Sequence, residues 1–316
     1  MRALVPLVEG VELIGPLPAG VRVDVWDASG DPPGGGDGVE VWVPPFPPID
    51  DYETPLSKLP QLRVVQMLTA GYDHIRPYVP DEVTLCNAGS VHDGPAAEWV
   101  LSALLAVVRR LPIYVEEQRS GSVMRKESDT LIGKTVLILG YGGIGQAVER
   151  RLAGFEVKVI RVASRAREGV HGPEDLPDLL PRADVVVLAL PLSDRTRDLV
   201  DAEFLACLPD GAIVVNASRG PVVDQEALQA ELERERLRAA LDVTTPDPLQ
   251  AEHPIRFLRN VLYTPHVAGA TRLVLPRAFG LVGDQIRRCH GREPLTNVVA
   301  GPVDPGRAPA PRVDAE

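Results

Sequence analysis

Three polar segments in the second half of the chain carry residues that could bind an anion and move a proton. They are VVNASRGPVVD, ALDVTTPDPL and LYTPHVAGAT. Arg219, in the first, has a planar and permanently charged guanidinium that matches the two oxygens of a carboxylate. His266, in the third, is a histidine, the residue type whose side chain can both donate and accept a proton near neutral pH, so it suits proton transfer in both directions. These residue types indicate acid–base chemistry on a small carboxylic acid.

Each of these residues also has an ordinary structural interpretation. Arg219 could form a salt bridge at a strand end, although the following Gly220 and Pro221 favour a loop. His266 could be structural, but its place between a proline and a turn of small residues favours catalysis. Asp247, in the second segment, could simply cap a turn beside proline. Both interpretations stay open for Asp247.

A glycine-rich segment, KTVLILGYGGIGQAVERRLAG, carries GxGxxG between an expected strand and an expected helix. Gly140 permits a tight turn, Gly142 lets the backbone approach a pyrophosphate, and Gly145 allows close packing of helix on strand. A structural glycine turn is the alternative. The strand before it and the helix after it favour dinucleotide binding at a helix N-terminus.

The end of the next expected strand predicts which nicotinamide cofactor is bound. Sites for NAD place Asp or Glu there to bind the ribose 2'-hydroxyl, whereas this chain has Ala163, followed by Ser164, Arg165 and Arg167. Arg can pair with a 2'-phosphate that a carboxylate would repel. We therefore expect NADP(H) to be preferred, with NAD(H) possible if these are only surface residues beside an NAD site.

The elements that must position these residues alternate between short β-branched runs and helical segments, which predicts parallel sheets covered on both faces. Helices are expected over 95–110, 144–152, 225–236 and 272–288. The expected strands cover 22–26, 39–43, 63–68, 83–86, 135–139, 157–162, 185–190, 212–215, 239–243 and 261–263.

Together these motifs resemble the D-2-hydroxyacid dehydrogenase family, which includes phosphoglycerate dehydrogenases, glyoxylate/hydroxypyruvate reductases and D-lactate dehydrogenases. The resemblance runs from about Leu68 to Val299. It implies that Arg219 binds the substrate carboxylate and helps to polarise the 2-oxo group, and that His266 is the acid/base. The family's third residue is a Glu that holds the histidine. Here it is Asp247, one methylene shorter, so contact would need a small backbone shift or a bridging water.

The resemblance also implies further contacts with substrate and cofactor. The backbone N–H groups of Ala70 and Gly71, in LTAGYDHI, would cradle the substrate carboxylate. Asp242 could bind the nicotinamide carboxamide or could cap a strand end, and both roles stay open. His92 and Asp93 are interpreted as structural, because no third residue at a suitable spacing completes a metal site. The remaining cofactor contacts would be Gly143, Ile144, Leu190, Pro191 and Ala217.

Two doubly wound parallel-sheet domains are expected, with a Rossmann dinucleotide domain (95–271) inserted into a flavodoxin-like substrate domain (1–94 plus 272–316). The family resemblance also implies a homodimer that uses about 95–131, although the long apolar helix there could simply be core. The tail from 301 onward, rich in Pro, Gly and Ala, is expected to be frayed.

Composition excludes several other classes of function. The formal charge of -11 argues against nucleic acid as a partner, because phosphate binding needs clustered Lys and Arg. The apolar run Trp99–Val108 is too short to span a bilayer, so no membrane role is expected. Three scattered cysteines, Cys86, Cys207 and Cys289, fit a reducing cytoplasm rather than a disulfide framework.

The sequence thus predicts an oxidoreductase that transfers a hydride between NADP(H) and C2 of a small 2-oxo or 2-hydroxy acid. A glyoxylate/hydroxypyruvate-type reductase is favoured, because cells hold NADP mainly reduced. The alternatives are an NAD-dependent phosphoglycerate dehydrogenase, a dehydrogenase for formate or phosphite, and a non-catalytic dinucleotide-sensing protein.

Overall fold

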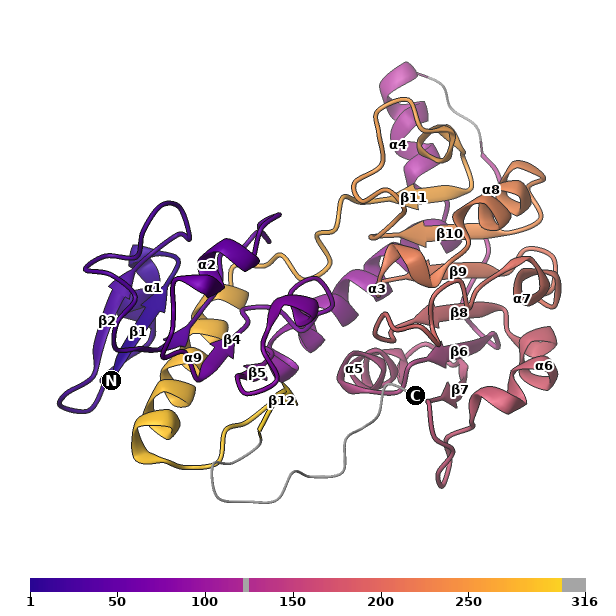
Figure 1. Ribbon diagram of the computed structural model, residues 1–316. Helices are drawn as coiled ribbons and strands as arrows, with labels where there is room; N and C mark the ends of the chain where they lie inside the picture. Colours follow the sequence, from indigo (N-terminus) through magenta and orange to yellow (C-terminus); the bar gives the residue numbers. More distant parts are fainter. Residues whose placement is uncertain (122–124, 303–316) are drawn as a thin grey trace. The chain divides into compact units, whose positions relative to one another are not determined.

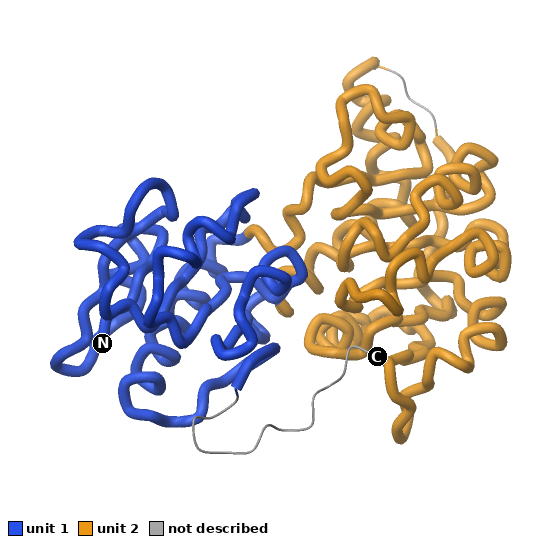
Figure 2. The backbone as a smooth tube through the Cα atoms, in the orientation of Figure 1, with its two compact units in different colours: residues 1–92, 271–316 blue, residues 93–270 orange. Residues whose placement is uncertain are grey.

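The computed structural model describes residues 1–121 and 125–302, which form two compact units. The first unit combines residues 1–92 with the chain from 271 onward, and the second comprises residues 93–270 (Figure 2). The boundaries expected from the sequence differ from these by one or two residues. The assignment of substrate binding to the first unit stays a prediction.

The first unit is built on a sheet in the order β12-β5-β4-β3-β1-β2. All neighbouring strands pair in parallel except β12, which runs antiparallel to β5. Without β12, the order is the flavodoxin-like 2-1-3-4-5. The strands are β1 (Arg2–Val5), β2 (Arg22–Val25), β3 (Val39–Trp42), β4 (Val64–Gln66), β5 (Thr84–Cys86) and β12 (Val298–Ala300).

Alternate side chains of this sheet enter two cores, as expected of a sheet that is covered on both faces. On one face, Val41 and Cys86 pack with Phe279 and Ile286 of helix α9. On the other, Trp42 and Leu85 pack with Tyr52, Leu59 and Ile75 of the connecting segments. The helices are α1 (Val8–Leu13), α2 (Glu53–Ser57) and α9 (Val274–Gly291), with 3-10 turns η1 (Arg76–Tyr78) and η2 (Gly89–His92).

The second unit carries a parallel sheet in the order β11-β10-β9-β8-β6-β7 (Figure 1). A parallel bridge between Val162 and His171 adds a rudimentary strand beyond β7, which completes the Rossmann order 3-2-1-4-5-6, with β11 as a seventh strand at the other edge. The order in which successive strands are added to the sheet therefore reverses between β6 and β8. The strands are β6 (Thr135–Leu139), β7 (Lys158–Val162), β8 (Val185–Leu188), β9 (Ile213–Asn216), β10 (Arg238–Leu241) and β11 (Val261–Tyr263).

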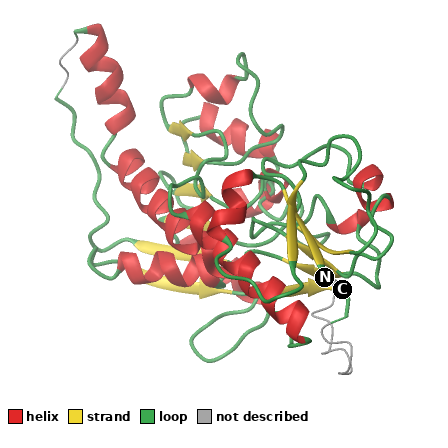
Figure 3. Cartoon of the chain, turned by 90° about the vertical axis from the view of Figure 1, so that its left-hand side faces the viewer, coloured by secondary structure: helices red, strands yellow, loops and turns green. Residues whose placement is uncertain are grey.

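Helices cover both faces of this second sheet. Val136 and Ile138 point to α3 and α5, whereas Leu137 and Leu139 point to the side of α6, α7 and α8. Figure 3 shows these helices and strands from a second side. The helices are α3 (Asp93–Val108), α4 (Leu111–Ser120), α5 (Gly143–Leu152), α6 (Leu176–Leu179), α7 (Ala202–Ala206) and α8 (Gln225–Glu233); the 3-10 turns are η3 (Pro173–Asp175), η4 (Leu180–Arg182), η5 (Gly220–Val222) and η6 (Pro254–Phe257).

The expected fold class, two doubly wound α/β units, is confirmed, while several elements differ from expectation. Strands β1 and β12 and helix α4 were not anticipated. The strand expected over 185–190 ends at Leu188, which leaves Leu190 and Pro191 in a loop. The prediction of a frayed tail falls largely on residues 303–316, outside the described residues. No helix among the described residues has the length and apolar character needed to cross a bilayer.

Candidate active site

The polar segments of the second unit follow the carboxyl ends of parallel strands, and these ends lie along one edge of a parallel sheet. The glycine-rich loop follows β6, Leu190 and Pro191 follow β8, and Ala217 and Arg219 follow β9. Open α/β sheets bind ligands at this edge, near the point where the strand order reverses. The topology therefore brings most of the expected site residues to one region of this unit.

The geometry of the glycine-rich loop matches the separate reason given for each glycine. Gly140 has φ of +103°, and a Cβ there would lie 2.3 Å from the carbonyl oxygen of Ala189, in the loop after β8. A Cβ on Gly145 would lie 2.3 Å from the carbonyl oxygen of Gly140. Around Gly142, by contrast, no heavy atom of the described residues other than its neighbours along the chain lies within 4 Å of such a Cβ. Gly142, the N-cap residue of α5, has no side chain that could cap the first N–H groups of the helix.

A carboxylate lies beside this helix start. A Cβ on Gly143 would meet an Asp93 carboxylate oxygen at 2.1 Å, so a larger residue there would displace the Asp93 side chain. Burial raises the pKa of the Asp93 carboxyl, although the charge of Arg150 opposes the rise. Sequence reasoning treated Asp93 as structural and had no signal for this contact. Among the described residues, no group of three or more His, Cys, Asp or Glu is arranged to hold a metal ion.

Beyond β7, Ser164, Arg165 and Arg167 are exposed. Arg167 donates a hydrogen bond to the carbonyl oxygen of Tyr141 at 3.1 Å, and its guanidinium carbon lies 5.9 Å from the centre of the Tyr141 ring. Tyr141 belongs to the glycine-rich loop, so Arg167 is tied to that loop. Arg161 instead pairs with Glu149 of α5 and lowers the pKa of that carboxyl.

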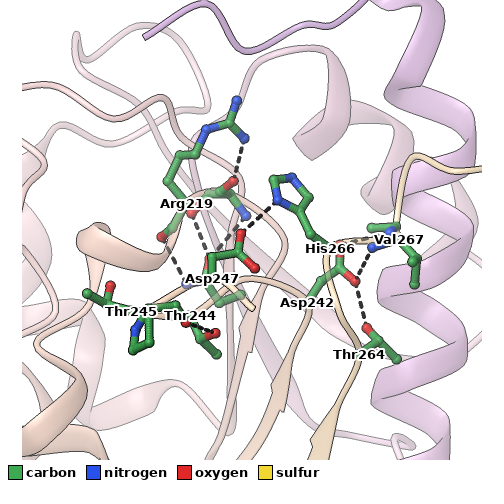
Figure 4. Close-up of polar contacts among 12 residues, drawn as sticks. Arg219, Asp242, Thr244, Thr245, Asp247, Thr264, His266 and Val267 are labelled. Carbon is green, nitrogen blue, oxygen red and sulfur yellow. Dashed lines mark hydrogen bonds and ion pairs between the residues drawn. The ribbon is translucent and has the colours of Figure 1, made fainter. Parts of the chain in front are cut away.

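His266 and Asp247 are in direct contact, with 2.7 Å between the imidazole Nδ1 and a carboxylate oxygen (Figure 4). No bridging water is needed, although Asp is one methylene shorter than the Glu of the family pattern. The His266 side chain is 50% exposed and that of Asp247 26% exposed. Solvent or a ligand can therefore reach the imidazole while its Nδ1 side is occupied.

Asp242, at the end of β10, shapes the turn that carries His266. Its buried carboxylate accepts hydrogen bonds from the Thr264 hydroxyl at 2.6 Å and from the N–H groups of Val267 and Ala268 at 2.8 and 2.7 Å. The His266 N–H donates to the Asp242 carbonyl oxygen at 2.7 Å. These bonds hold His266 at φ of +56°, a left-handed conformation uncommon outside glycine. With these bonds Asp242 caps the strand end. Its binding of the nicotinamide carboxamide stays a prediction.

Arg219 lies in the segment that follows β9. The Asn216 side chain donates to the Arg219 carbonyl oxygen at 3.1 Å, and the guanidinium of Arg219 donates to the Ser218 carbonyl oxygen at 2.9 Å. Figure 4 shows Arg219, Asp247 and His266 in one neighbourhood. The sequence segments that suggested chemistry are thus brought together by β9, β10 and β11.

The candidate substrate-binding residues Ala70 and Gly71 belong to the first unit, in the loop after β4. The Asn87 amide donates to the Ala70 carbonyl oxygen at 2.8 Å, and the Thr69 hydroxyl donates to that of Gly71 at 2.7 Å. Neither the Ala70 nor the Gly71 N–H donates to another group of the described residues. Both amides therefore stay available, and Asn87 has a structural role, because its side chain holds this loop. Their part in carboxylate binding stays a prediction.

Comparison with known proteins agrees with this architecture. Residues 101–268 match the family model of the D-isomer specific 2-hydroxyacid dehydrogenase NAD-binding domain. The chain belongs to the D-isomer specific 2-hydroxyacid dehydrogenase family. Glyoxylate/hydroxypyruvate reductase B of Yersinia pestis is 32% identical to it over 230 residues, which cover 68% of this dehydrogenase and 71% of the relative. D-3-phosphoglycerate dehydrogenase of Methanocaldococcus jannaschii is 31% identical over 261 residues, 79% of this chain but half the length of that protein.

Solved structures give the same result. A D-isomer specific 2-hydroxyacid dehydrogenase from Xanthobacter autotrophicus Py2, in complex with NADPH and MES, superposes with a TM-score of 0.79 at 31% identity, covering 94% of this chain and 97% of that one. An NADPH-dependent glyoxylate/hydroxypyruvate reductase from Sinorhizobium meliloti, in complex with NADP and sulfate, gives 0.79 at 28% identity, covering 94% and 96%. This dehydrogenase is therefore an NAD(P)-dependent oxidoreductase.

Proposed function

We propose that the protein is an NADP(H)-preferring reductase of a small 2-oxo acid, of the glyoxylate or hydroxypyruvate type. The observation that carries the proposal is the direct contact of His266 with Asp247, in one neighbourhood with Arg219. This arrangement supplies an oriented acid–base group and a cation that matches a carboxylate. The named reductases among the relatives support the choice of substrate class.

In this proposal each of the three side chains has a separate task. The Arg219 guanidinium binds the substrate carboxylate and polarises the neighbouring 2-oxo group. The Asp247 carboxylate accepts a hydrogen bond from the Nδ1–H of His266, which fixes the tautomer and turns Nε2 toward the substrate. In reduction, protonated His266 donates a proton from Nε2 to the substrate oxygen, and in oxidation Nε2 accepts it from the hydroxyl. Asp247 stabilises the charged imidazolium in both directions.

The nucleotide loop fits a dinucleotide. Gly142 supplies no side-chain cap at the start of α5 and leaves open space there, which suits a pyrophosphate, and the N–H groups of Gly143 and Ile144 would bind it. Gly140 and Gly145 shape the loop. When bound, the nicotinamide supplies or accepts the hydride at C2 of the acid. We assign the remaining cofactor contacts to Leu190, Pro191, Ala217 and Asp242.

Arg165→Ala combined with Arg167→Ala is expected to raise the KM for NADPH about 10- to 100-fold and to change that for NADH far less. The reason is that these exposed guanidinium groups would pair with the 2'-phosphate, and hydrogen bonds to charged groups are worth about 1.5–3 kcal/mol. Steady-state kinetics with both cofactors measures the effect. Arg234→Ala, an exposed arginine at the end of α8, is the control and should change neither value. Equal losses with NADPH and NADH would contradict the assignment.

Initial rates with glyoxylate, hydroxypyruvate, pyruvate and phenylpyruvate, each with NADPH and NADH, test the proposed function. We expect turnover of the small acids with a preference for NADPH. A clear preference for NADH would overturn the choice of cofactor. Tight NADPH binding without turnover of any acid would instead favour a dinucleotide-sensing protein.

We also propose that the protein is a homodimer that uses the region of about 95–131. Helix α4 leaves Leu111 and Val115 exposed at 51% and 46%, which supports an interface there. Light scattering is expected to give twice the chain mass of 34.1 kDa. Leu111→Glu with Val115→Glu should shift the mass to that of one chain, and a monomeric wild type would contradict the proposal.

A further inference from the structure

The loop that carries Asp247 is fastened to the start of α8 by one side chain, Gln225. The Gln225 amide oxygen accepts the Thr245 N–H at 2.7 Å, and its amide nitrogen donates to the Thr245 carbonyl oxygen. The amide thus satisfies both backbone polar groups of Thr245, two positions before Asp247. Only a side chain that both donates and accepts can do this, and a carboxylate at neutral pH only accepts.

Gln225 is itself held in a rigid setting. It is the first residue of α8, directly after Asp224, whose carboxylate caps the helix by accepting the Ala227 N–H at 3.0 Å. The Asp224 N–H donates to the Val200 carbonyl oxygen. Because the start of α8 is anchored in this way, the Gln225 amide holds the Thr245 backbone in a defined place relative to the sheet.

The same loop also packs against the segment that carries Arg219. A Cβ on Gly220 would lie 1.9 Å from the Thr244 carbonyl oxygen, so the two backbones are in close contact there. Within the loop, the Thr244 hydroxyl donates to the Pro246 carbonyl oxygen at 2.7 Å. Gln225 lies at the far end of the segment 219–225, and this segment therefore meets the Asp247 loop at both of its ends.

We propose that Gln225 is a positioning residue for the acid–base pair. It holds the Thr245 backbone so that the Asp247 carboxylate stays in contact with His266 Nδ1. Asp has a single methylene between backbone and carboxylate, so the place of its oxygens depends closely on the backbone. A loop that moves outward by about 1 Å would break a contact of 2.7 Å. The inference rests on the proposed function, because it assigns Gln225 an effect on that reaction.

Gln225→Ala is expected to lower kcat about tenfold, the effect of one or two neutral hydrogen bonds, and to leave the KM for the cofactor unchanged. Gln225→Glu should lower kcat at least as much, because its carboxylate would face the Thr245 carbonyl oxygen. Gln229→Ala is the matched control. Gln229 lies one turn further along α8 and donates to Glu233 of the same helix, so its removal should leave kcat unchanged.

A double-mutant cycle distinguishes positioning from a general loss of structure. If Gln225 acts through Asp247, Gln225→Ala should lower kcat much less in an Asp247→Asn background than in the wild type. If the two effects simply multiply, Gln225 does not act through Asp247 and the proposal is wrong. Unchanged kcat in Gln225→Ala would overturn it as well.

A measurement that needs no turnover separates this inference from the proposed function. Long-range proton–nitrogen NMR of the carbon-bound ring protons reports the tautomer of His266, assigned by its loss in His266→Ala. Wild type and Gln229→Ala should hold the proton on Nδ1. Asp247→Asn lacks the carboxylate that fixes the tautomer and should show a mixture of both tautomers, and Gln225→Ala should show the same mixture. The same tautomer in Gln225→Ala as in the wild type would refute the positioning role, even if the protein reduced none of the acids.

Discussion

His266→Ala is expected to lower kcat about 10³-fold, because a positioned general acid or base contributes about 10²–10⁴-fold. The substitution removes the group that gives the substrate oxygen its proton, while the fold of the turn should survive. That turn is held by the carboxylate of Asp242, which binds backbone N–H groups of Val267 and Ala268 rather than the imidazole. Initial rates at saturating substrate and cofactor measure the effect.

The chain offers a chemically matched control for this substitution. His171 Nδ1 lies 2.8 Å from an Asp175 carboxylate oxygen, in a second His–Asp pair that is also exposed. His171→Ala removes the same kind of side chain from the same unit, outside the segments assigned to catalysis. It should leave kcat unchanged. If both variants lost similar activity, or if His266→Ala kept more than about a tenth of the wild-type kcat, His266 would not be the acid–base residue.

The sequence predicted those parts of the site in which the local backbone geometry requires one particular residue type. Gly140 needs its positive φ, and Gly145 has no room for a side chain, so a local motif could reveal both. The strands of the second unit were also predictable, because Val, Ile and Leu fill runs buried on both faces. The fold class followed from the alternation of these elements.

Contacts between distant segments could not be predicted in the same way. The direct reach of Asp247 to His266 depends on where the loop after β10 is held, and one of its anchors, Gln225, lies 20 residues before Thr245. Asp242 left two roles open because a strand-end carboxylate suits either. Strand β12 pairs with β5, about 200 residues away, and its short run Val298–Ala300 carries little pattern of its own. Tertiary contacts decide such elements.

Arg219→Gln is expected to lower kcat/KM about 10³-fold for a 2-oxo acid, because it removes the guanidinium that pairs with the substrate carboxylate. Loss of one partner of a buried charged pair costs about 2–5 kcal/mol. Arg219→Lys should also lose activity, by about 10²-fold, since an ammonium cannot bind two carboxylate oxygens in one plane. Arg182→Gln, an exposed arginine of η4, is the control and should behave as wild type. Thermal unfolding checks that each variant is folded, since Arg219 also bonds to the Ser218 carbonyl oxygen.

The substrate itself can show whether Arg219 recognises the carboxylate or only supports the loop. The methyl ester of the same 2-oxo acid lacks the negative charge, so wild type should reduce it far more slowly than the acid. If Arg219 binds the carboxylate, this preference for acid over ester should largely disappear in Arg219→Gln, because the guanidinium that reads the charge is gone. If the variant loses activity equally on acid and ester, Arg219 acts on the loop or on the 2-oxo group, and the residue that binds the carboxylate has to be sought elsewhere. The unengaged amides of Ala70 and Gly71 would then be the first candidates, since backbone N–H groups can bind a carboxylate without any cationic side chain.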